Sequence, residues 1–416
     1  MFSNLKRKFS NSSANEEHPR KQRANSTLET VSGGQENHTT QSITNFINIL
    51  DLSGQNTTAS FQLRFDELAR YILHDSVIVV QDVQGILATF EVLELEFYLW
   101  KAVVHEDPFT HGSVEQAKGG NWYFHRAPQR SHDSGKSAIV STKGYRGGTR
   151  KGLDITIGPA VTVTSPYFSS LPSEDSENSH IPSTRGGILL RTLRNTHTNQ
   201  VVSGPSLIVD EILKLTRAKS ISDLVENQWK GDISAFRGKG QIVAGESILY
   251  LMSKSPSPHE AQATKIYQSP RIGLGLSHPS VSLSPSFNHP RVVFLSKPYR
   301  YFSHPELLTS NGRPQTFLGV LNLLQAGSAK SLDALLGFDE HESKQLLENI
   351  STLSGMKLLT ATKYLEYYFG KHCVQSSDLD LSSFIGQSKH DSPSSYLSLI
   401  GFLHKNRTSD SEREAI

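Results

Sequence analysis

A short stretch around residue 95 carries side chains that can do acid–base chemistry. In LELEFYLW, Glu94, Glu96 and Tyr98 alternate with apolar residues, and His111 follows a proline-containing loop. Residues two apart on a strand share a face and lie about 7 Å apart. Repulsion between the two carboxylates, together with partial burial, would raise the pKa of one of them, as an acid–base catalyst requires. An ordinary solvated sheet face is the commoner explanation, although Tyr98 and His111 add stacking groups that suit a planar ligand.

A glycine-rich basic segment, GYRGGTRKG, spans residues 144–152. Its backbone amides and the cations of Arg146, Arg150 and Lys151 fit a phosphate or a nucleic-acid backbone. The segment lacks a Gly-Lys-Ser/Thr ending, so it is not a nucleoside-triphosphate loop. A glycine-bearing hairpin with solvated charges fits the segment equally well.

Histidine and aromatic residues recur after the LELEFYLW stretch. The segment WYFHR places Tyr123 and His125 on one face of a predicted strand, where core aromatics are the common explanation. Histidines at positions 105, 111, 125 and 132 raise the question of a metal site, but their spacing fits no zinc pattern and the single cysteine, Cys373, adds no ligand. We therefore expect neither a metal nor another cofactor.

Composition bounds the class of protein. Of the 416 residues, 36% are hydrophobic, which is low for a fully folded chain and indicates disordered segments. The net charge is only +2, so local charge clusters matter more than the total. No apolar run reaches the roughly 18 residues of a membrane span, and the N-terminus lacks the core of a signal peptide. With one cysteine, the sequence excludes a disulfide framework and predicts a soluble intracellular protein with no membrane partner.

The chain divides into four predicted parts. Residues 1–58 are polar and poor in aromatics, which predicts a disordered tail. Two basic clusters in this tail, KRK at 6–8 and RKQR at 20–23, indicate a bipartite nuclear-import signal, an import receptor as partner and a nuclear location. A generic basic tail is the alternative, and an unchanged location after deletion of residues 1–25 would exclude the signal. Residues 59–310 have globular patterns, 315–405 have helical periodicity, and 406–416 are expected to be a disordered tail.

Within the globular part, the hydrophobic pattern predicts helices near 60–74 and 204–216. Strands are predicted at 76–81, after a turn at Gly85, and near 121–126, 152–158, 186–193 and 245–252. The order of these segments resembles the alkyladenine (methylpurine) DNA glycosylase family. FDELARYIL is similar to the first helix of that family, LELEFYL to its Glu-x-Glu-x-Tyr-Leu strand, and DPFTHG to its Asp-x-x-x-His loop. GNWYFHR, GLDITIG, GGILLRTL, SGPSLIVDEIL, SPRIGLGL and KPYRYFSHP follow in the family's order, so the resemblance covers residues 62–305.

The resemblance implies a fold and an activity. The fold is α+β, a single domain with a curved, largely antiparallel sheet and surrounding helices, in a monomer. The activity is that of a monofunctional DNA glycosylase in base excision repair. Such an enzyme flips alkylated or deaminated purines out of double-stranded DNA and hydrolyses the N-glycosidic bond. An alkylated base is already a good leaving group, so one carboxylate that activates water suffices.

The resemblance also implies roles for individual residues. Glu96 aligns with the general base that activates water, Glu94 is its supporting neighbour, and Arg191 aligns with an arginine beside it. The remaining aligned residues are Tyr98 and His111, which would sandwich the flipped base, and Ile272 and Gly273, which would line the base pocket. In such an enzyme the basic loop with Arg146, Arg150 and Lys151 would hold the DNA backbone, which positions the duplex without reading its sequence.

Three positions depart from the family pattern. His125 stands where the family has a second stacking tyrosine, and Asp154 where it has an asparagine that screens the exocyclic amine of guanine. We hypothesise that Asp154 accepts that amine and changes the purine preference. The tyrosine that wedges into the duplex has no clean equivalent, and Tyr145 is the candidate. These departures leave open a catalytically altered DNA-binding or interaction protein on the same scaffold; a hydrolase of nucleosides or other glycosides is a third possibility.

Overall fold

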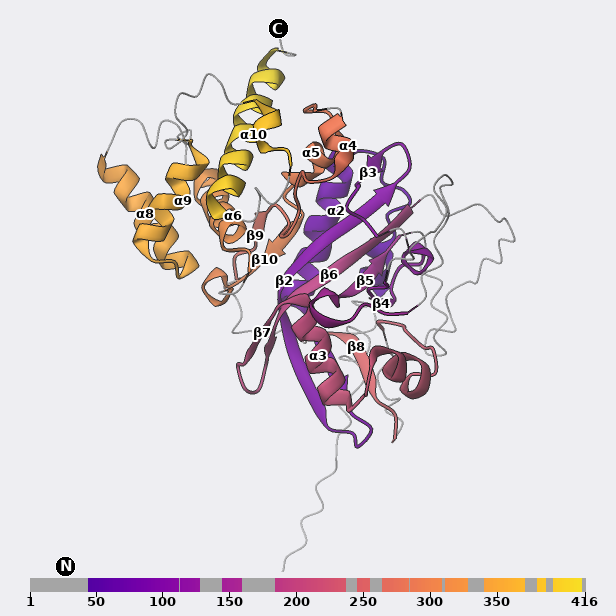
Figure 1. The fold of residues 1–416 in the computed structure, drawn as a ribbon. Coiled ribbons are helices and arrows are strands. Elements are labelled where there is room, and N and C mark those ends of the chain that lie inside the picture. Colours follow the sequence, from indigo (N-terminus) through magenta and orange to yellow (C-terminus); the bar gives the residue numbers. More distant parts are fainter. Residues whose placement is uncertain are drawn as a thin grey trace, which may run out of the picture.

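One large antiparallel sheet organises the fold (Figure 1). The structure, a computed structural model, describes residues 44–111, 113–127, 144–158, 184–236, 245–254, 264–283, 285–308, 311–327, 340–370, 380–386 and 392–413. The strands of this part of the chain are β1 (Ser76–Gln81), β2 (Leu87–Lys101), β3 (His105–Glu106), β4 (Trp122–Phe124), β5 (Leu153–Ile157), β6 (Thr184–Asn195), β7 (Val201–Ser203), β8 (Ile248–Ser253), β9 (Tyr267–Ser269) and β10 (Arg300–Phe302). They run in the order β4-β5-β6-β2-β1-β8, with β10 beside β2 and β9 beside β10. The predicted α+β class with a largely antiparallel sheet is confirmed.

Helices surround this sheet. They are a helix over 44–50, α2 (Thr58–Arg70), α3 (Pro205–Thr216), α4 (Pro279–Leu283), α5 (Pro290–Leu295), α6 (Arg313–Ala326), α8 (Glu340–Ser354), α9 (Leu358–Tyr368) and α10 (Pro393–Arg413). Short 3-10 or π turns lie at η1 (Tyr71–Asp75), η2 (Val114–Ala117), η3 (Gly148–Arg150), η5 (Asp223–Gln228), η6 (Pro305–Leu307) and η7 (Leu381–Phe384). Local signals explain where the two helices predicted in the globular part begin. Thr57 and Ser60 form a reciprocal capping box at the start of α2, and Pro205 occupies the first turn of α3.

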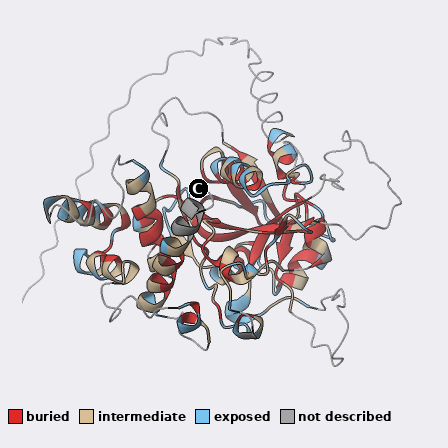
Figure 2. Ribbon diagram, turned by 90° about the horizontal axis from the view of Figure 1, so that it is seen from above, coloured by how far each residue is buried: buried red, intermediate tan, exposed pale blue. Residues whose placement is uncertain are grey.

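The main hydrophobic core lies between the sheet and α2. Leu95, Phe97 and Leu99 of β2 are fully buried, and the Phe65 ring of α2 stacks on Phe97 with ring centres 4.3 Å apart. Figure 2 shows that the buried residues concentrate in the sheet and on the helix faces turned toward it. Burying Leu95, Phe97 and Leu99 in this core turns Glu94, Glu96 and Tyr98 toward the opposite face.

A β-bulge interrupts β2 just before Glu94. The register with β6 shifts on either side of Glu94, so that Leu93 and Arg191 have no directly opposed partner. Consequently, Val92 and Leu95 belong to the same core cluster, whereas Leu93 belongs to a second one. The sequence pattern predicted an uninterrupted alternation from Leu93 to Leu99, which is wrong at Leu93. Bulges often re-aim side chains next to functional sites, and this one adds Arg191 to the face that carries the two glutamates.

The predicted boundaries of the terminal tails need correction. Phe46 and Leu50 of the helix over 44–50 are buried in the main core, so the prediction of a disordered tail is wrong for residues 44–58. Residues 1–43, with both basic clusters, lie outside the described residues. At the other end, α10 continues to Arg413, so the expected tail at 406–416 is wrong for 406–413. Apolar residues spaced for helix packing, such as Phe46 and Leu50, outweigh a polar local composition.

The helices after residue 313 pack against the sheet. α6, α8, α9 and α10 lie together beside β9 and β10 (Figure 1). Their apolar faces share one hydrophobic cluster with Leu93, Tyr267 and Phe302 of the sheet. A Cβ at Gly319 of α6 would lie 2.6 Å from the Phe302 ring, so only glycine permits this approach. The helices of the described part include none that combines the length and the apolar character of a membrane span.

Candidate active site

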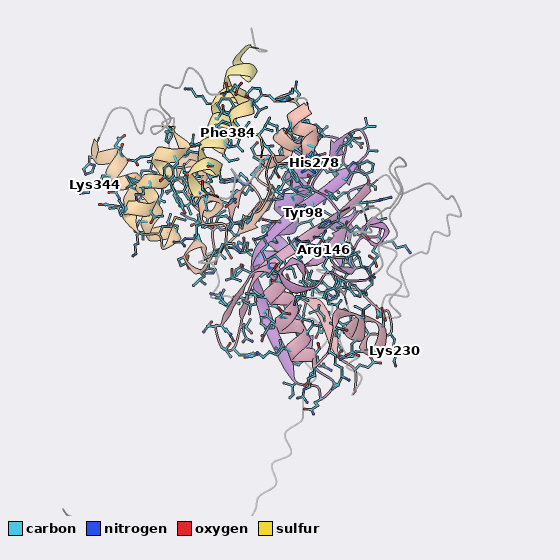
Figure 3. The ribbon with its side chains drawn as sticks, in the orientation of Figure 1. Tyr98, Arg146, Lys230, His278, Lys344 and Phe384 are labelled. Carbon is cyan, nitrogen blue, oxygen red and sulfur yellow. The ribbon has the colours of Figure 1, made fainter. Side chains whose placement is uncertain are left out.

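A row of directly opposed residues crosses six strands of the sheet. From β4 through β5, β6, β2 and β10 to β9, the row consists of Tyr123, Asp154, Leu189, Glu96, Arg300 and Ser269. Opposed residues project to the same face of a sheet. Because neighbouring strands lie about 4.8 Å apart, Glu96 and Asp154 are about 10 Å apart along the row, with Leu189 between them. The sheet therefore gathers the predicted general base and the predicted specificity residue on one face. Tyr98, which Figure 3 labels, is two residues from Glu96 on β2 and so belongs to the same face.

Glu96 is fully buried and held by three donors. Its Oε1 accepts a hydrogen bond from the Ile272 amide at 2.7 Å. Its Oε2 accepts from the Tyr98 hydroxyl at 2.9 Å and from Arg191 Nη1 at 3.2 Å. An ionised carboxylate offers about four lone-pair sites, so the donors among the described residues leave one site for a water molecule. The alternative of an ordinary solvated sheet face is wrong, because Glu96 is 0% exposed.

Glu94 belongs to the same network. Arg300 Nε and Arg191 Nε donate to its Oε1 at 2.7 and 3.2 Å, and the Thr192 hydroxyl donates to its Oε2 at 2.5 Å. Burial alone would raise the pKa of Glu94, but Arg300, Arg191 and Thr192 together lower it below its ordinary value. The expectation that repulsion raises a carboxyl pKa is therefore wrong for Glu94. Arg191 bridges Glu94 and Glu96, and with Arg300 it balances their two charges.

A second buried ion pair adjoins this network. Arg271 donates two hydrogen bonds to Asp107, at 2.6 and 3.2 Å, and both side chains are fully buried. The Arg271 guanidinium also lies 4.4 Å from the centre of the Tyr98 ring. Burial, and then the Glu96 carboxylate, raises the pKa of Tyr98 well above its ordinary value, so its hydroxyl stays protonated and donates. The pair fixes the chain immediately before Ile272, the residue whose amide holds Glu96.

Gly273 continues this segment. Its φ is 77°, a left-handed conformation that favours glycine, and it forms a turn with Ile272. The structure thus brings together five of the residues predicted from the sequence. These are Glu96, Tyr98, Arg191, Ile272 and Gly273.

His111, His125 and Asp154 form a second group. The rings of His111 and His125 meet edge to face with centres 4.7 Å apart, and His125 Nε2 lies 2.9 Å from Asp154 Oδ1. His125 and Asp154 are therefore partners of each other. Two glycines make room for them: a Cβ at Gly152 would lie 2.5 Å from the His125 ring, and one at Gly187 would lie 2.6 Å from Asp154 Oδ2.

Burial, and to a smaller degree the neighbouring His125, lowers the pKa of His111 to about 4. The unfolded chain has an ordinary histidine pKa of about 6.5, so between pH 6.5 and 4 it binds a proton that the folded protein does not. Stability is therefore lost as the pH falls through this range. We expect wild type to lose more unfolding free energy than His111→Phe between pH 6.5 and 4, as measured by urea denaturation. Equal losses in the two proteins would contradict this placement of His111.

The predicted phosphate-binding cations differ in their surroundings. Lys151 Nζ pairs with Asp210 of α3, and Arg146 Nε donates to the Arg126 carbonyl at 2.9 Å. Arg150 is exposed in η3. Of these three cations, Arg150 is thus the one whose side chain meets solvent most openly, and the roles of all three toward DNA stay predictions.

Tyr145 lies at the base of the hairpin between β4 and β5. It forms an isolated bridge with Arg126, whose guanidinium lies 3.8 Å from the centre of the Tyr145 ring. Both residues line a cavity of about 200 Å³ together with Trp122 and Tyr123, at the edge of the sheet rather than over Glu96. Residues 128–143 of this hairpin lie outside the described residues, and the wedge role of Tyr145 stays a prediction.

Four residues of the site have no role in the sequence-based hypothesis: Asp107, Thr192, Arg271 and Arg300. Asp107, Arg271 and Arg300 lie in segments that the resemblance matched, DPFTHG, SPRIGLGL and KPYRYF. A single charged residue in a strand or loop does not reveal its partner, because the partner is more than a hundred positions away in both ion pairs. Arg271 reaches Asp107, and Arg300 reaches Glu94.

Metal-ligating side chains are not grouped at this site. In the part of the chain that the structure describes, no three His, Cys, Asp or Glu residues are arranged to hold a metal ion. His105 is buried and bonded instead to the Leu99 carbonyl and the Tyr299 hydroxyl, each at 2.9 Å. His132 lies outside the described residues.

Comparison with known proteins adds one relative. The chain matches no protein-family model. It is 26% identical over 220 residues to an uncharacterized protein of Acanthamoeba polyphaga mimivirus, a match that covers 50% of this chain and 78% of the viral protein. That relative carries no stated activity, so the geometry of the site is the basis for a functional proposal.

Proposed function

We propose that the protein is a monofunctional DNA glycosylase that removes alkylated or deaminated purines from double-stranded DNA. The observation that carries the proposal is the buried Glu96 carboxylate, oriented by Ile272, Tyr98 and Arg191 on one face of the sheet. The resemblance of residues 62–305 to methylpurine DNA glycosylases supports the same activity. The basic clusters at 6–8 and 20–23 would direct such an enzyme to the nucleus through an import receptor.

In the proposed reaction, Glu96 accepts a proton from a bound water molecule. The water oxygen forms a bond to C1′ of the damaged nucleotide, and the bond from C1′ to the purine nitrogen breaks. The purine departs with the electron pair, which leaves an abasic sugar and an intact phosphate backbone. Arg191 keeps Glu96 oriented by donating to it at 3.2 Å. A positioned base of this kind contributes roughly 10²–10⁴-fold to a rate.

The rings near Glu96 suit an extruded base. A purine inside a duplex cannot be reached, so it has to leave the stack and bind between flat side chains. Tyr98, His111 and His125 are the candidate stacking groups. Since the pKa of His111 is about 4, its ring is uncharged at neutral pH. An uncharged ring stacks on a cationic alkylpurine without repulsion.

Asp154 is proposed to set the purine preference. Its Oδ1 is 2.9 Å from His125 Nε2, and its Oδ2 accepts from Gln116 at 3.4 Å. Each oxygen has a second lone pair, which is free to accept the exocyclic amine of guanine. Asp154→Asn should lower excision of guanine-derived lesions relative to adenine-derived ones by about tenfold, while the surface control Asp75→Asn leaves the ratio unchanged. Equal relative rates in wild type and Asp154→Asn would refute the assignment.

A catalytically altered DNA-binding or interaction protein is the second candidate. The full burial of Glu96 favours it, because a substrate needs access to this carboxylate.

A duplex carrying an abasic analogue separates the candidates from a nucleoside hydrolase. Both DNA-binding candidates should bind this duplex more tightly than undamaged DNA, with an affinity that falls as salt rises. No preference for the abasic analogue, together with hydrolysis of free nucleosides, would overturn the proposal.

A further inference from the structure

Arg300 joins the glutamate network to the C-terminal helices. This side chain is fully buried in β10, and each of its three nitrogens donates to a different element. Arg300 Nε donates to Glu94 Oε1 at 2.7 Å, Nη1 to Ser269 Oγ of β9 at 3.0 Å, and Nη2 to Thr316 Oγ1 of α6 at 3.0 Å. Its guanidinium also lies 4.2 Å from the centre of the Phe302 ring. Each nitrogen of this cation therefore has a partner, and α6 supplies one of the three.

The start of α6 reaches Glu96 by a second path. A Cβ at Gly312, the residue that precedes α6, would lie 2.1 Å from Ile272 Cδ1. Ile272 is the residue whose amide donates to Glu96. The first turn of α6 therefore contacts the glutamate network at two places. Gly312 packs against Ile272, and Thr316 accepts a hydrogen bond from Arg300.

Arg191 is shared between the two glutamates, so the position of Glu96 depends on how well Glu94 is held by its other partners. Arg191 donates to Glu94 and to Glu96 at the same distance, 3.2 Å. Of the two arginines that donate to Glu94, Arg300 is the closer, at 2.7 Å. A loosened Arg300 would leave Glu94 short of positive charge, and Arg191 would move toward Glu94 and away from Glu96.

We propose that Thr316 is a positioning residue for the general base, so that the C-terminal helices complete the active site through the chain Thr316, Arg300, Glu94, Arg191 and Glu96. This inference rests on the proposed glycosylase function. Thr316 and Gln315 of α6 and Tyr396 of α10 are buried, and the two helices are in contact, which keeps water away from this chain of contacts. Water there would compete for each hydrogen bond.

The test compares Thr316→Val with Thr316→Ser. Valine has nearly the shape of threonine but no hydroxyl, whereas serine keeps the hydroxyl. We expect Thr316→Val to lower the single-turnover excision rate on a deoxyinosine duplex by about tenfold, with unchanged affinity for an abasic-analogue duplex. Thr316→Ser should recover most of the rate. The matched control is Thr362→Val on α9, whose hydroxyl donates within its own helix, to the Leu358 carbonyl.

Several results would overturn the inference. One is a Thr316→Val rate within twofold of wild type, and another is a Thr316→Ser rate as low as that of valine. A parallel loss of rate and abasic-DNA affinity would indicate a purely structural role and also overturn it. If Thr316→Val does not fold, Ser269→Ala serves in its place, because it removes another contact of the Arg300 guanidinium. This variant must then lower the excision rate and keep the affinity for the abasic-analogue duplex. Wild type that excises nothing would instead refute the proposed function, and this inference with it.

Discussion

Replacing Glu96 by glutamine is expected to lower the single-turnover rate of base excision by about 10³-fold. Glutamine has nearly the same shape, but it cannot accept a proton from water. Both oxygens of Glu96 accept hydrogen bonds, one from the Ile272 amide and the other from Tyr98 and Arg191, so the NH₂ of glutamine would meet a donor in either orientation. The rate is measured on a lesion duplex with enzyme in excess, and retained affinity for an abasic-analogue duplex shows that the variant is folded.

Glu91→Gln is the matched control for this prediction. Glu91 lies on the same strand, β2, and pairs with Arg194 and Lys254 away from Arg191. The control should keep the wild-type excision rate within about twofold. A Glu96→Gln protein that still excises at the rate of Glu91→Gln would remove Glu96 from the mechanism.

The second large effect concerns stability. Asp107→Ala is expected to reduce the free energy of unfolding by about 3–5 kcal/mol, because it leaves the Arg271 cation buried without its counter-charge. The Phe109 amide, which donates to Asp107 at 3.0 Å, would lose its acceptor as well. Urea denaturation at neutral pH measures the change.

Asp75→Ala provides the comparison for a surface ion pair. The Arg70–Asp75 pair has side chains that are 65% and 47% exposed, so its loss should cost no more than about 1 kcal/mol. Similar losses of unfolding free energy in Asp107→Ala and Asp75→Ala would mean that groups other than Asp107 balance the charge of Arg271. The ion pair would then not be what fixes Ile272 beside Glu96.

Local patterns in the sequence predicted most of the sheet. The sequence predicted a strand with the alternating LELEFYLW after the turn at Gly85, and β2 (Leu87–Lys101) is that strand, because one face of it packs on α2 and the other does not. The same alternation failed at Leu93, since a bulge depends on the partner strand β6 and leaves no mark in β2 alone. The polar composition before residue 58 hid the helix over 44–50, whose apolar residues, among them Phe46, lie in the core or pack against it.

The site was predictable only in part, for a related reason. Glu96, Tyr98 and Arg191 were found because a resemblance fixed their relation, and the structure brings them into one network. That network also depends on Arg300 and Thr316. Both residues lie over two hundred positions after Glu94 in the chain, and they reach it through contacts between distant segments. Periodicity and spacing describe single elements, so they contain no information on which buried arginine meets which carboxylate.

The pairing of His125 with Asp154 illustrates the same limit. Each residue departs from the family pattern, and in the sequence they are two separate changes. Across β4 and β5 they become one hydrogen-bonded pair, 2.9 Å apart, which glycines at 152 and 187 accommodate.

The most direct test of the central claim is a time course of wild-type protein on a duplex with one deoxyinosine or ethenoadenine. Two products are followed separately: the free base, and strand breaks formed before and after treatment with alkali. The proposed mechanism predicts release of the free base and a strand that breaks only after alkali, because water attack leaves an abasic site and an intact backbone. No release of free base at any protein excess would contradict it. A strand broken without alkali would contradict it too, because that result requires a covalent intermediate rather than a water activated by Glu96.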